Sequence, residues 1–186
     1  MALIGGWTLA AALRPDRFDP VTQTISALAA RGEPHRWVMT TALVAVGVAH
    51  LGTAAALRPA APAGRAVLAL GGLATIGVAA LPLPAATQEG GPGAGAHAAV
   101  AGVAFVALAV WPALAWRRRP AAAVLRPATA AVATTVLLGL VSWFTLELRQ
   151  DGDAVGLTER VAAGAQALWP LAVVGALGAA RRRPRP

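Results

Sequence analysis

The sequence predicts an all-α bundle of six transmembrane helices, and two observations support this fold class. First, 57% of the 186 residues are hydrophobic and only 13% are charged, about half the charged share of a typical soluble domain. Second, the charges are gathered in short clusters between long apolar stretches, and about 20 apolar residues suffice to cross a bilayer as a helix. The whole chain, residues 1–186, is therefore predicted to form a single transmembrane domain.

Five apolar stretches are long enough to be complete spans. Each holds about 20 residues, which corresponds to about 30 Å of helix. Their abundant Ala and Gly favour close contacts between neighbouring helices. Tryptophans near their ends are expected to act as interface anchors; these are Trp37, Trp111, Trp116 and Trp143. The predicted bounds are 37–57, 66–86, 96–116, 127–147 and 161–180.

The first apolar segment, residues 2–13, is shorter. As a helix it would be only about 18 Å long. No basic segment precedes it, as one would in a cleaved signal peptide. We interpret it as the end of a first span whose start is missing from the chain. A re-entrant or tilted short helix is the alternative.

The orientation follows from the distribution of arginine, because cytoplasmic loops of membrane proteins are enriched in basic residues. All 16 basic residues are Arg. With both termini in the cytoplasm, the inner segments hold 10 Arg, and the outer loops hold six Arg and all eight acidic residues. We therefore predict a multi-pass protein of the cell membrane with cytoplasmic N- and C-termini. The heavy use of Ala, Arg, Gly and Pro is typical of a GC-rich bacterial genome.

The first outer loop contains a helix-start pattern. Asp19 followed by Pro20 fits an N-cap and the first position of a helix. In the following turns Val21, Ile25 and Leu28 would share one face. The pattern predicts a short amphipathic helix over residues 20–30, lying at the membrane interface or folded back into the mouth of the bundle.

Polar residues from three outer segments are expected to converge, because ionisable groups near hydrocarbon tend to face a cavity or one another. Arg17, Gln88, Glu89, Ser142 and Arg149 belong to these segments. Arg160 would hold an anionic group of a ligand, and His97 would be a pH-sensitive donor. The predicted ligand-binding residues are Asp19, Gln23, Ser26, His97, Glu147, Glu159 and Arg160.

Several of these residues also have simpler interpretations. Asp19 would serve as an N-cap, and Glu159 would favour the positive end of a helix dipole. Arg160 would pair with Glu159 or reach lipid head groups. His97 would be an interfacial residue with a backbone partner.

Two polar residues lie deeper in their spans. His50 and Gln166 are surrounded in the sequence by Ala, Gly and Leu. Such side chains in a membrane bundle usually form hydrogen bonds between helices. Both are therefore predicted to connect neighbouring spans.

The alternative to a binding or transport protein is a membrane-embedded enzyme of hydrolase type. Ser26, His97 and Glu159 would then be its catalytic residues, although no G-x-S-x-G pattern is present. The absence of Cys and the isolated positions of the three His predict no metal site. The glycine-rich residues 90–95 lack the Lys of a phosphate loop. No cofactor is expected, and an enzyme is the less favoured interpretation.

The net charge of +8 could suggest a nucleic-acid partner. The Arg residues, however, lie in short clusters beside apolar spans, which is typical of topology determinants. Membrane lipids and a small or lipid-like ligand are therefore the predicted partners, and nucleic acid is excluded. A structural or accessory subunit is a third possibility, and the oligomeric state is left open.

Three motifs resemble those of the six-helix prokaryotic membrane proteins catalogued as domain of unknown function, number 998. These are RFDPVTQTISAL at 17–28, LPLP at 81–84 followed by His97, and GLTERVAAGAQALW at 156–169. The resemblance extends over nearly the whole chain. It implies a complete first span and gives weight to Ser26, His97 and Arg160, but it implies no activity. Ala27 stands where the family usually has an acidic residue, and Glu89 lies beyond the second usual acidic position.

Overall fold

The computed structural model describes residues 1–14, 18–85 and 93–182, and within these ranges all regular structure is helical. Five helices are long and apolar enough to cross a membrane: α3, α4, α5, α6 and α7. The predicted all-α fold is confirmed. The elements are α1 (Ala2–Ala12), α2 (Ile25–Leu28), α3 (Arg36–Ala56), α4 (Pro62–Ala80), α5 (Ala94–Ala115), the 3-10 helix η2 (Ala123–Leu125), α6 (Pro127–Arg149) and α7 (Val155–Arg182).

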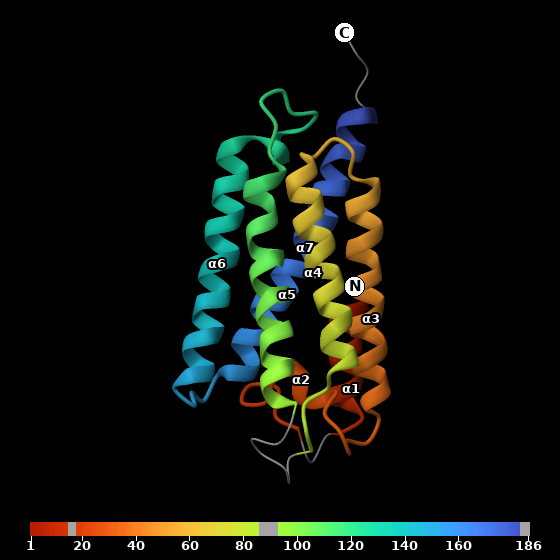
Figure 1. The fold of residues 1–186 in the computed structure, drawn as a ribbon, viewed down its shortest axis with the longest axis vertical. Helices are drawn as coiled ribbons and strands as arrows, with labels where there is room; N and C mark the ends of the chain where they lie inside the picture. The colour runs from red at the N-terminus through yellow and green to blue at the C-terminus, as the bar shows by residue number, and fades with distance from the viewer. Residues whose placement is uncertain (15–17, 86–92, 183–186) are drawn as a thin grey trace.

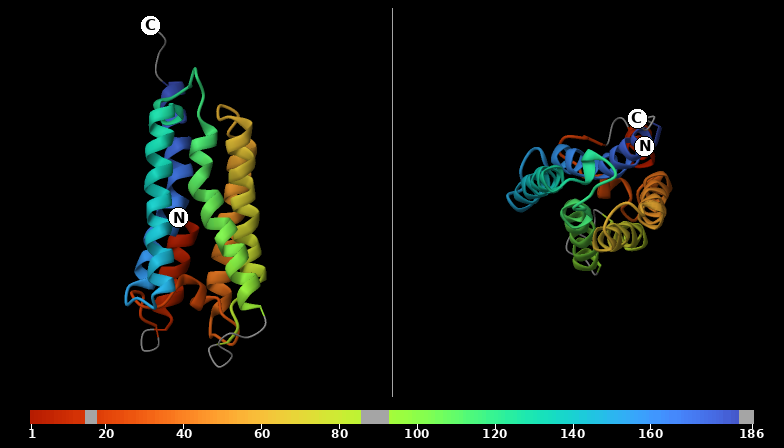
Figure 2. Two further views of the ribbon diagram at one scale, coloured as in Figure 1. Left: turned by 60° about the vertical axis from the view of Figure 1, so that its left-hand side comes forward. Right: turned by 90° about the horizontal axis from the view of Figure 1, so that it is seen from above.

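The five long helices run side by side, and the chain reverses direction from each one to the next (Figure 1). Helix α4 packs between α3 and α5, and α6 packs against both α5 and α7. Helix α1 starts about halfway along the bundle and packs mainly against α3 (Figures 1 and 2). At 11 residues it is about 17 Å long, so it covers only part of the height of the bundle.

The two ends of the bundle differ in charge. The end at which α2 lies and α6 meets α7, here called the acidic end, is the lower end in Figure 1. The opposite end, the arginine end, is where α3 meets α4 and α5 meets α6. The described acidic residues all lie at the acidic end: Asp19, Glu33, Glu147, Asp151, Asp153 and Glu159.

Glycine allows the helix backbones to approach closely. A Cβ added at Gly72 of α4 would lie 2.8 Å from the carbonyl oxygen of Gly47 in α3. On the other side of α4, a Cβ at Gly64 would lie 2.5 Å from the Cα of Ala115 in α5. These contacts confirm that small residues bring the helices together.

Two predicted spans differ from the observed helices. Helix α4 ends at Ala80 and not at residue 86, because Pro82 and Pro84 cannot continue a helix. Helix α7 begins at Val155 and not at residue 161. Glu159 and Arg160 therefore belong to α7, where the first loop supplies partners for their polar groups.

The predicted helix over residues 20–30 is wrong in its extent, because α2 covers only Ile25–Leu28. Its N-cap is Thr24, whose hydroxyl accepts a hydrogen bond from the Ala27 amide. Asp19 instead accepts the amide hydrogen of Val21 at 2.8 Å, and such local side-chain bonds compete with helix formation. Helix α2 folds into the mouth of the bundle, since Ile25 is buried there.

Trp111 was predicted to be an interface anchor, and this is wrong. It is almost completely buried and packs with Leu68 and Leu125 near the arginine end. Apolar side chains of α4 and η2 surround its ring, so the ring is buried in the bundle and does not reach the interface. The side chains of Trp37, Trp116 and Trp143 are exposed.

Candidate functional site

Arg160 attaches the first loop to α7. Its Nη1 atom donates hydrogen bonds of 2.8 Å to the carbonyl oxygens of Pro20, Gln23 and Gly156. Its Cζ atom also lies 5.2 Å from the centre of the Phe18 ring, within cation–π range. Arg160 therefore holds the loop through its guanidinium group. This is the side chain that was predicted to bind an anionic group of a ligand.

Gly156 allows the same loop to approach the helix. A Cβ at this position would lie 2.2 Å from the carbonyl oxygen of Gln23. The amide of the next residue, Leu157, donates to the carbonyl oxygen of Val21 at 3.0 Å. The first turn of α7 thus replaces solvent as the hydrogen-bond partner of the loop.

Glu159 points from α7 into the bundle and is buried, with 4% of its surface exposed. One carboxylate oxygen accepts the amide hydrogen of Ile25, and the other lies 3.4 Å from the hydroxyl oxygen of Ser26. A buried carboxylate is costly unless it is hydrogen-bonded. The start of α2 supplies these donors, so the fold brings Ser26 and Glu159 together.

His97 lies in the first turn of α5 and is also buried. Its Nδ1 atom is 2.7 Å from the carbonyl oxygen of Leu81, just beyond the end of α4. A carbonyl can only accept, so Nδ1 carries the hydrogen, and a neutral ring leaves Nε2 as an acceptor. His97 therefore connects the end of α4 to the start of α5, and its Nε2 atom can accept a hydrogen bond from another partner.

A cleft of about 490 Å³ opens at the acidic end between α2, α5, α6 and α7. One part of its lining is apolar and includes Phe105, Val106 and Phe144. The polar part contains residues from four segments of the chain: Thr24, Ser26, His97, Thr145, Arg149 and Glu159. Three of the seven predicted ligand-binding residues, Ser26, His97 and Glu159, therefore line one cleft.

Four predicted ligand-binding residues do not line this cleft: Arg160, described above, and Asp19, Gln23 and Glu147. Asp19 is exposed, and the Val21 amide and the Thr22 hydroxyl donate to its carboxylate. The Gln23 side chain accepts the amide hydrogen of Asp19 at 3.1 Å. Glu147 accepts the amide hydrogen of Ala154 at 3.2 Å. These three side chains stabilise loops.

Five further residues were predicted to converge with the ligand-binding set, and the structure describes two of them. Ser142 is exposed on α6 and is not part of the cleft lining. Arg17, Gln88 and Glu89 lie outside the described residues. Arg149, which was expected only near the site, lines the cleft.

A family model described as "Protein of unknown function (DUF998)" matches residues 1–176. The chain belongs to the DUF998 family. No curated protein and no solved structure matches the chain. Together with the five apolar helices, membership of DUF998 identifies a multi-pass membrane protein.

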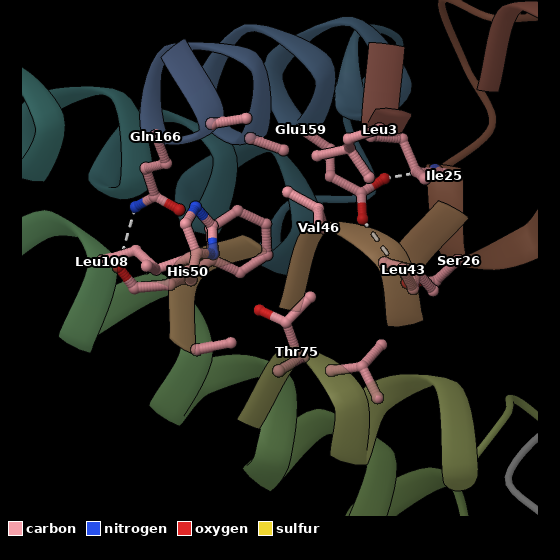
Figure 3. Close-up of a pocket in the computed structure, with 16 residues that line it drawn as sticks. Leu3, Ile25, Ser26, Leu43, Val46, His50, Thr75, Leu108, Glu159 and Gln166 are labelled. Atoms are coloured by element: carbon pink, nitrogen blue, oxygen red, sulfur yellow. Dashed lines mark hydrogen bonds between the residues drawn. The ribbon is translucent and has the colours of Figure 1, made fainter. Parts of the chain in front are cut away.

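A second cavity, of about 60 Å³, lies inside the bundle of this DUF998 protein (Figure 3). Ser26 and Glu159 line one part of it, and His50, Thr75 and Gln166 line the deeper part. Ser26 and Glu159 line the cleft as well. Ala101 and Phe105 also line both, so the cleft and the inner cavity adjoin.

The two deep polar residues behave differently. Gln166 donates to the carbonyl oxygen of Phe105 at 2.8 Å, which confirms a hydrogen bond between α7 and α5. His50 was also predicted to bond between helices, and this is wrong within the described part of the chain. Neither of its ring nitrogens has a hydrogen-bond partner there, and the side chain lines the inner cavity.

The geometry does not form the catalytic pair that the enzyme alternative requires. Ser26 and His97 line the same cleft, but no hydrogen bond joins them among the described residues. The Ser26 hydroxyl is directed at Glu159, and the His97 Nδ1 atom at Leu81. Within the same ranges, no group of three His, Asp or Glu side chains could hold a metal ion.

Few features of the sequence indicated the inner cavity. Glu159 and Gln166 are seven residues apart, a spacing that places both on one face of a helix. His50, however, comes from α3 and Thr75 from α4. Only the packing of three helices brings these side chains around one cavity.

Proposed function

We propose that this membrane protein binds an amphiphilic, lipid-like molecule with an anionic head group in the cleft at the acidic end. The division of the cleft lining carries this proposal. The cleft combines apolar side chains of α5 and α6 with the polar side chains of Ser26, His97 and Arg149. A volume of about 490 Å³ falls within the usual range of ligand sites.

The head group must supply most of the selectivity. A ligand that comes from the bilayer gains little hydrophobic free energy in the cleft, because lipid tails are as apolar as its wall. Hydrogen bonds to charged groups contribute about 1.5–3 kcal/mol each. Arg149 is exposed and forms no ion pair with a described residue, so it can receive an anion. The Nε2 atom of His97 is a second polar atom in the lining of the cleft.

The test uses two probes that differ only in their head groups. Lysophosphatidic acid has a phosphate monoester, and lysophosphatidylcholine of the same chain length is zwitterionic. The thermal unfolding midpoint of the detergent-solubilised protein is measured against the concentration of each probe, because a ligand that binds the folded state stabilises it. We expect the anionic probe to raise the midpoint more, and Arg149→Gln to remove the difference.

A cleft-filling variant with a matched control locates the site. A Cβ at Gly102, which lines the cleft, meets nothing within 4 Å, so Gly102→Leu would fill the cleft without a backbone clash. Gly139 on α6 is equally unobstructed and does not line it. We expect Gly102→Leu to abolish stabilisation by the probe and Gly139→Leu to retain it. Equal stabilisation of both variants would contradict the proposal.

A further inference from the structure

The inner cavity holds polar side chains for which the cleft proposal has no use. His50 is 4% exposed and lacks a partner for either ring nitrogen among the described residues. An unsatisfied buried polar group costs about 1–3 kcal/mol. Since the ring points into the cavity in Figure 3, molecules within the cavity can provide its hydrogen bonds.

The cavity connects His50 to Glu159. Glu159, Ala163 and Gln166 line it from α7, at positions that share one helix face. Seven residues of helix span about 10 Å, and His50 lies beside Gln166 in Figure 3. A water molecule needs about 10–15 Å³ of such volume and two to four polar partners; the cavity has about 60 Å³, and its polar lining is Ser26, His50, Thr75, Glu159 and Gln166. A short chain of water can therefore join the two side chains.

We propose that Glu159 and His50 form a proton-transfer pair, joined by water in the inner cavity and supplied with protons from the cleft. The O–H bond of the Glu159 carboxyl group breaks, and its proton passes to a water molecule. Each water accepts one proton and donates one, and the last donates to a ring nitrogen of His50. The products are a carboxylate and an imidazolium, so charge and protons balance.

The surroundings of Glu159 suit this role. Its carboxylate form receives hydrogen bonds from Ile25 and Ser26 of α2, and Arg160 is the adjacent cation on its own helix. His97 of α5 and Arg149 of α6 are the other titratable or charged residues that line the cleft with it.

The other elements around the inner cavity add no further charge. Leu3 of α1 and Thr75 and Val78 of α4 line it and are uncharged. Helix α3 lines it with Leu43, Val46 and His50, and of these three residues only His50 is titratable. The pair does not depend on the cleft ligand, and it can be tested in the ligand-free protein.

The test follows both groups in bilayers as pH is varied. Infrared spectroscopy detects the protonated carboxyl group, and solid-state NMR of isotope-labelled histidine detects the imidazolium ring. Glu159→Gln and His50→Phe identify the two signals. Coupled groups titrate as a pair, so each substitution should shift the midpoint of the other group. Unchanged midpoints in both variants would overturn the proposal.

A third variant tests the water connection without removing either group. Ala163→Val places extra volume in the cavity between the two side chains, and Ala172→Val adds the same volume at an exposed position of α7. We expect Ala163→Val to retain both signals and to separate their midpoints, and Ala172→Val to behave like the wild type. If Ala163→Val also titrates like the wild type, water in the cavity does not join the pair. His50→Gln provides a second substitution should the Phe ring disturb folding.

Discussion

Arg160 illustrates how one side chain can determine a loop conformation. Its three hydrogen bonds to backbone oxygens and its contact with Phe18 hold residues 18–23 against α7. A guanidinium is suited to this arrangement because its donors are fixed in one plane. The loop in turn supplies the Ile25 amide that satisfies Glu159. Arg160 thus donates hydrogen bonds to the loop, and the adjacent Glu159 accepts one from it.

Arg160→Ala should lower the free energy of unfolding by about 1.5–3 kcal/mol, because hydrogen bonds to a charged group are lost together with the contact on Phe18. Arg160→Lys should lie between this variant and the wild type, since an ammonium cannot reproduce the planar geometry. Unfolding of the detergent-solubilised protein by denaturant provides the measurement. Arg149→Ala, at an exposed position, should change stability by less than about 0.5 kcal/mol. Equal effects of Arg160→Ala and Arg149→Ala would contradict a structural role for Arg160.

Asp19 should make the first loop sensitive to acid. The hydrogen bond from the Val21 amide, followed by that from the Thr22 hydroxyl, lowers the pKa of Asp19 below its usual 3.8. A lowered pKa in the folded state means that the carboxylate stabilises the loop above about pH 3.8 and that this contribution is lost as pH falls through the folded-state value. Hydrogen exchange of residues 19–23 should therefore accelerate relative to Asp19→Asn as pH falls. An identical pH response of the two proteins would contradict this assignment.

At the scale of helices, small residues and prolines explain most of the packing. Gly72 allows α4 to approach α3, and Gly64 allows it to approach α5. Pro62 begins α4, and Pro82 follows soon after its end. The sequence indicated the small residues and the approximate spans, whereas contacts with other segments of the chain determined where α2 and α7 begin.

Gly72→Ala should destabilise the α3–α4 contact by about 1–3 kcal/mol, the usual cost of overpacking. The added methyl would lie 2.8 Å from the backbone oxygen of Gly47, which cannot rotate away as a side chain can. Gly52→Ala on α3 is the matched control, because a Cβ there meets nothing within 4 Å. It should leave stability unchanged or raise it by up to about 1 kcal/mol, as Ala favours helix more than Gly does. Thermal unfolding would distinguish the pair, and equal midpoints would contradict the close-contact argument.

At the scale of the whole molecule, the distribution of charge gives the bundle a direction. Acidic side chains lie at one end, and clusters such as Arg117–Arg119 lie at the other. Cytoplasmic loops are the basic ones in membrane proteins. We therefore expect the arginine end to face the cytoplasm and the cleft to face outward.

Cysteine labelling tests this orientation, because the natural chain has no cysteine. Asp153 is exposed at the acidic end, and Ala121 is exposed at the arginine end. A membrane-impermeant maleimide should label Asp153→Cys on intact cells and should label Ala121→Cys only after permeabilisation. The reverse pattern would show that the cleft faces inward.

The sequence predicted the helical class, the approximate positions of the five long apolar helices and the segregation of acidic residues, since these follow from composition and from spacing along the chain. It also selected Ser26, His97 and Glu159. Only the tertiary structure decided that Arg160 holds a loop, that Ser26 meets Glu159 and that His50 faces an inner cavity. The physical reason is that a side chain buried between helices takes its role from partners on distant segments: Glu159 and Ser26 are 133 residues apart, and no local pattern in the sequence encodes their contact.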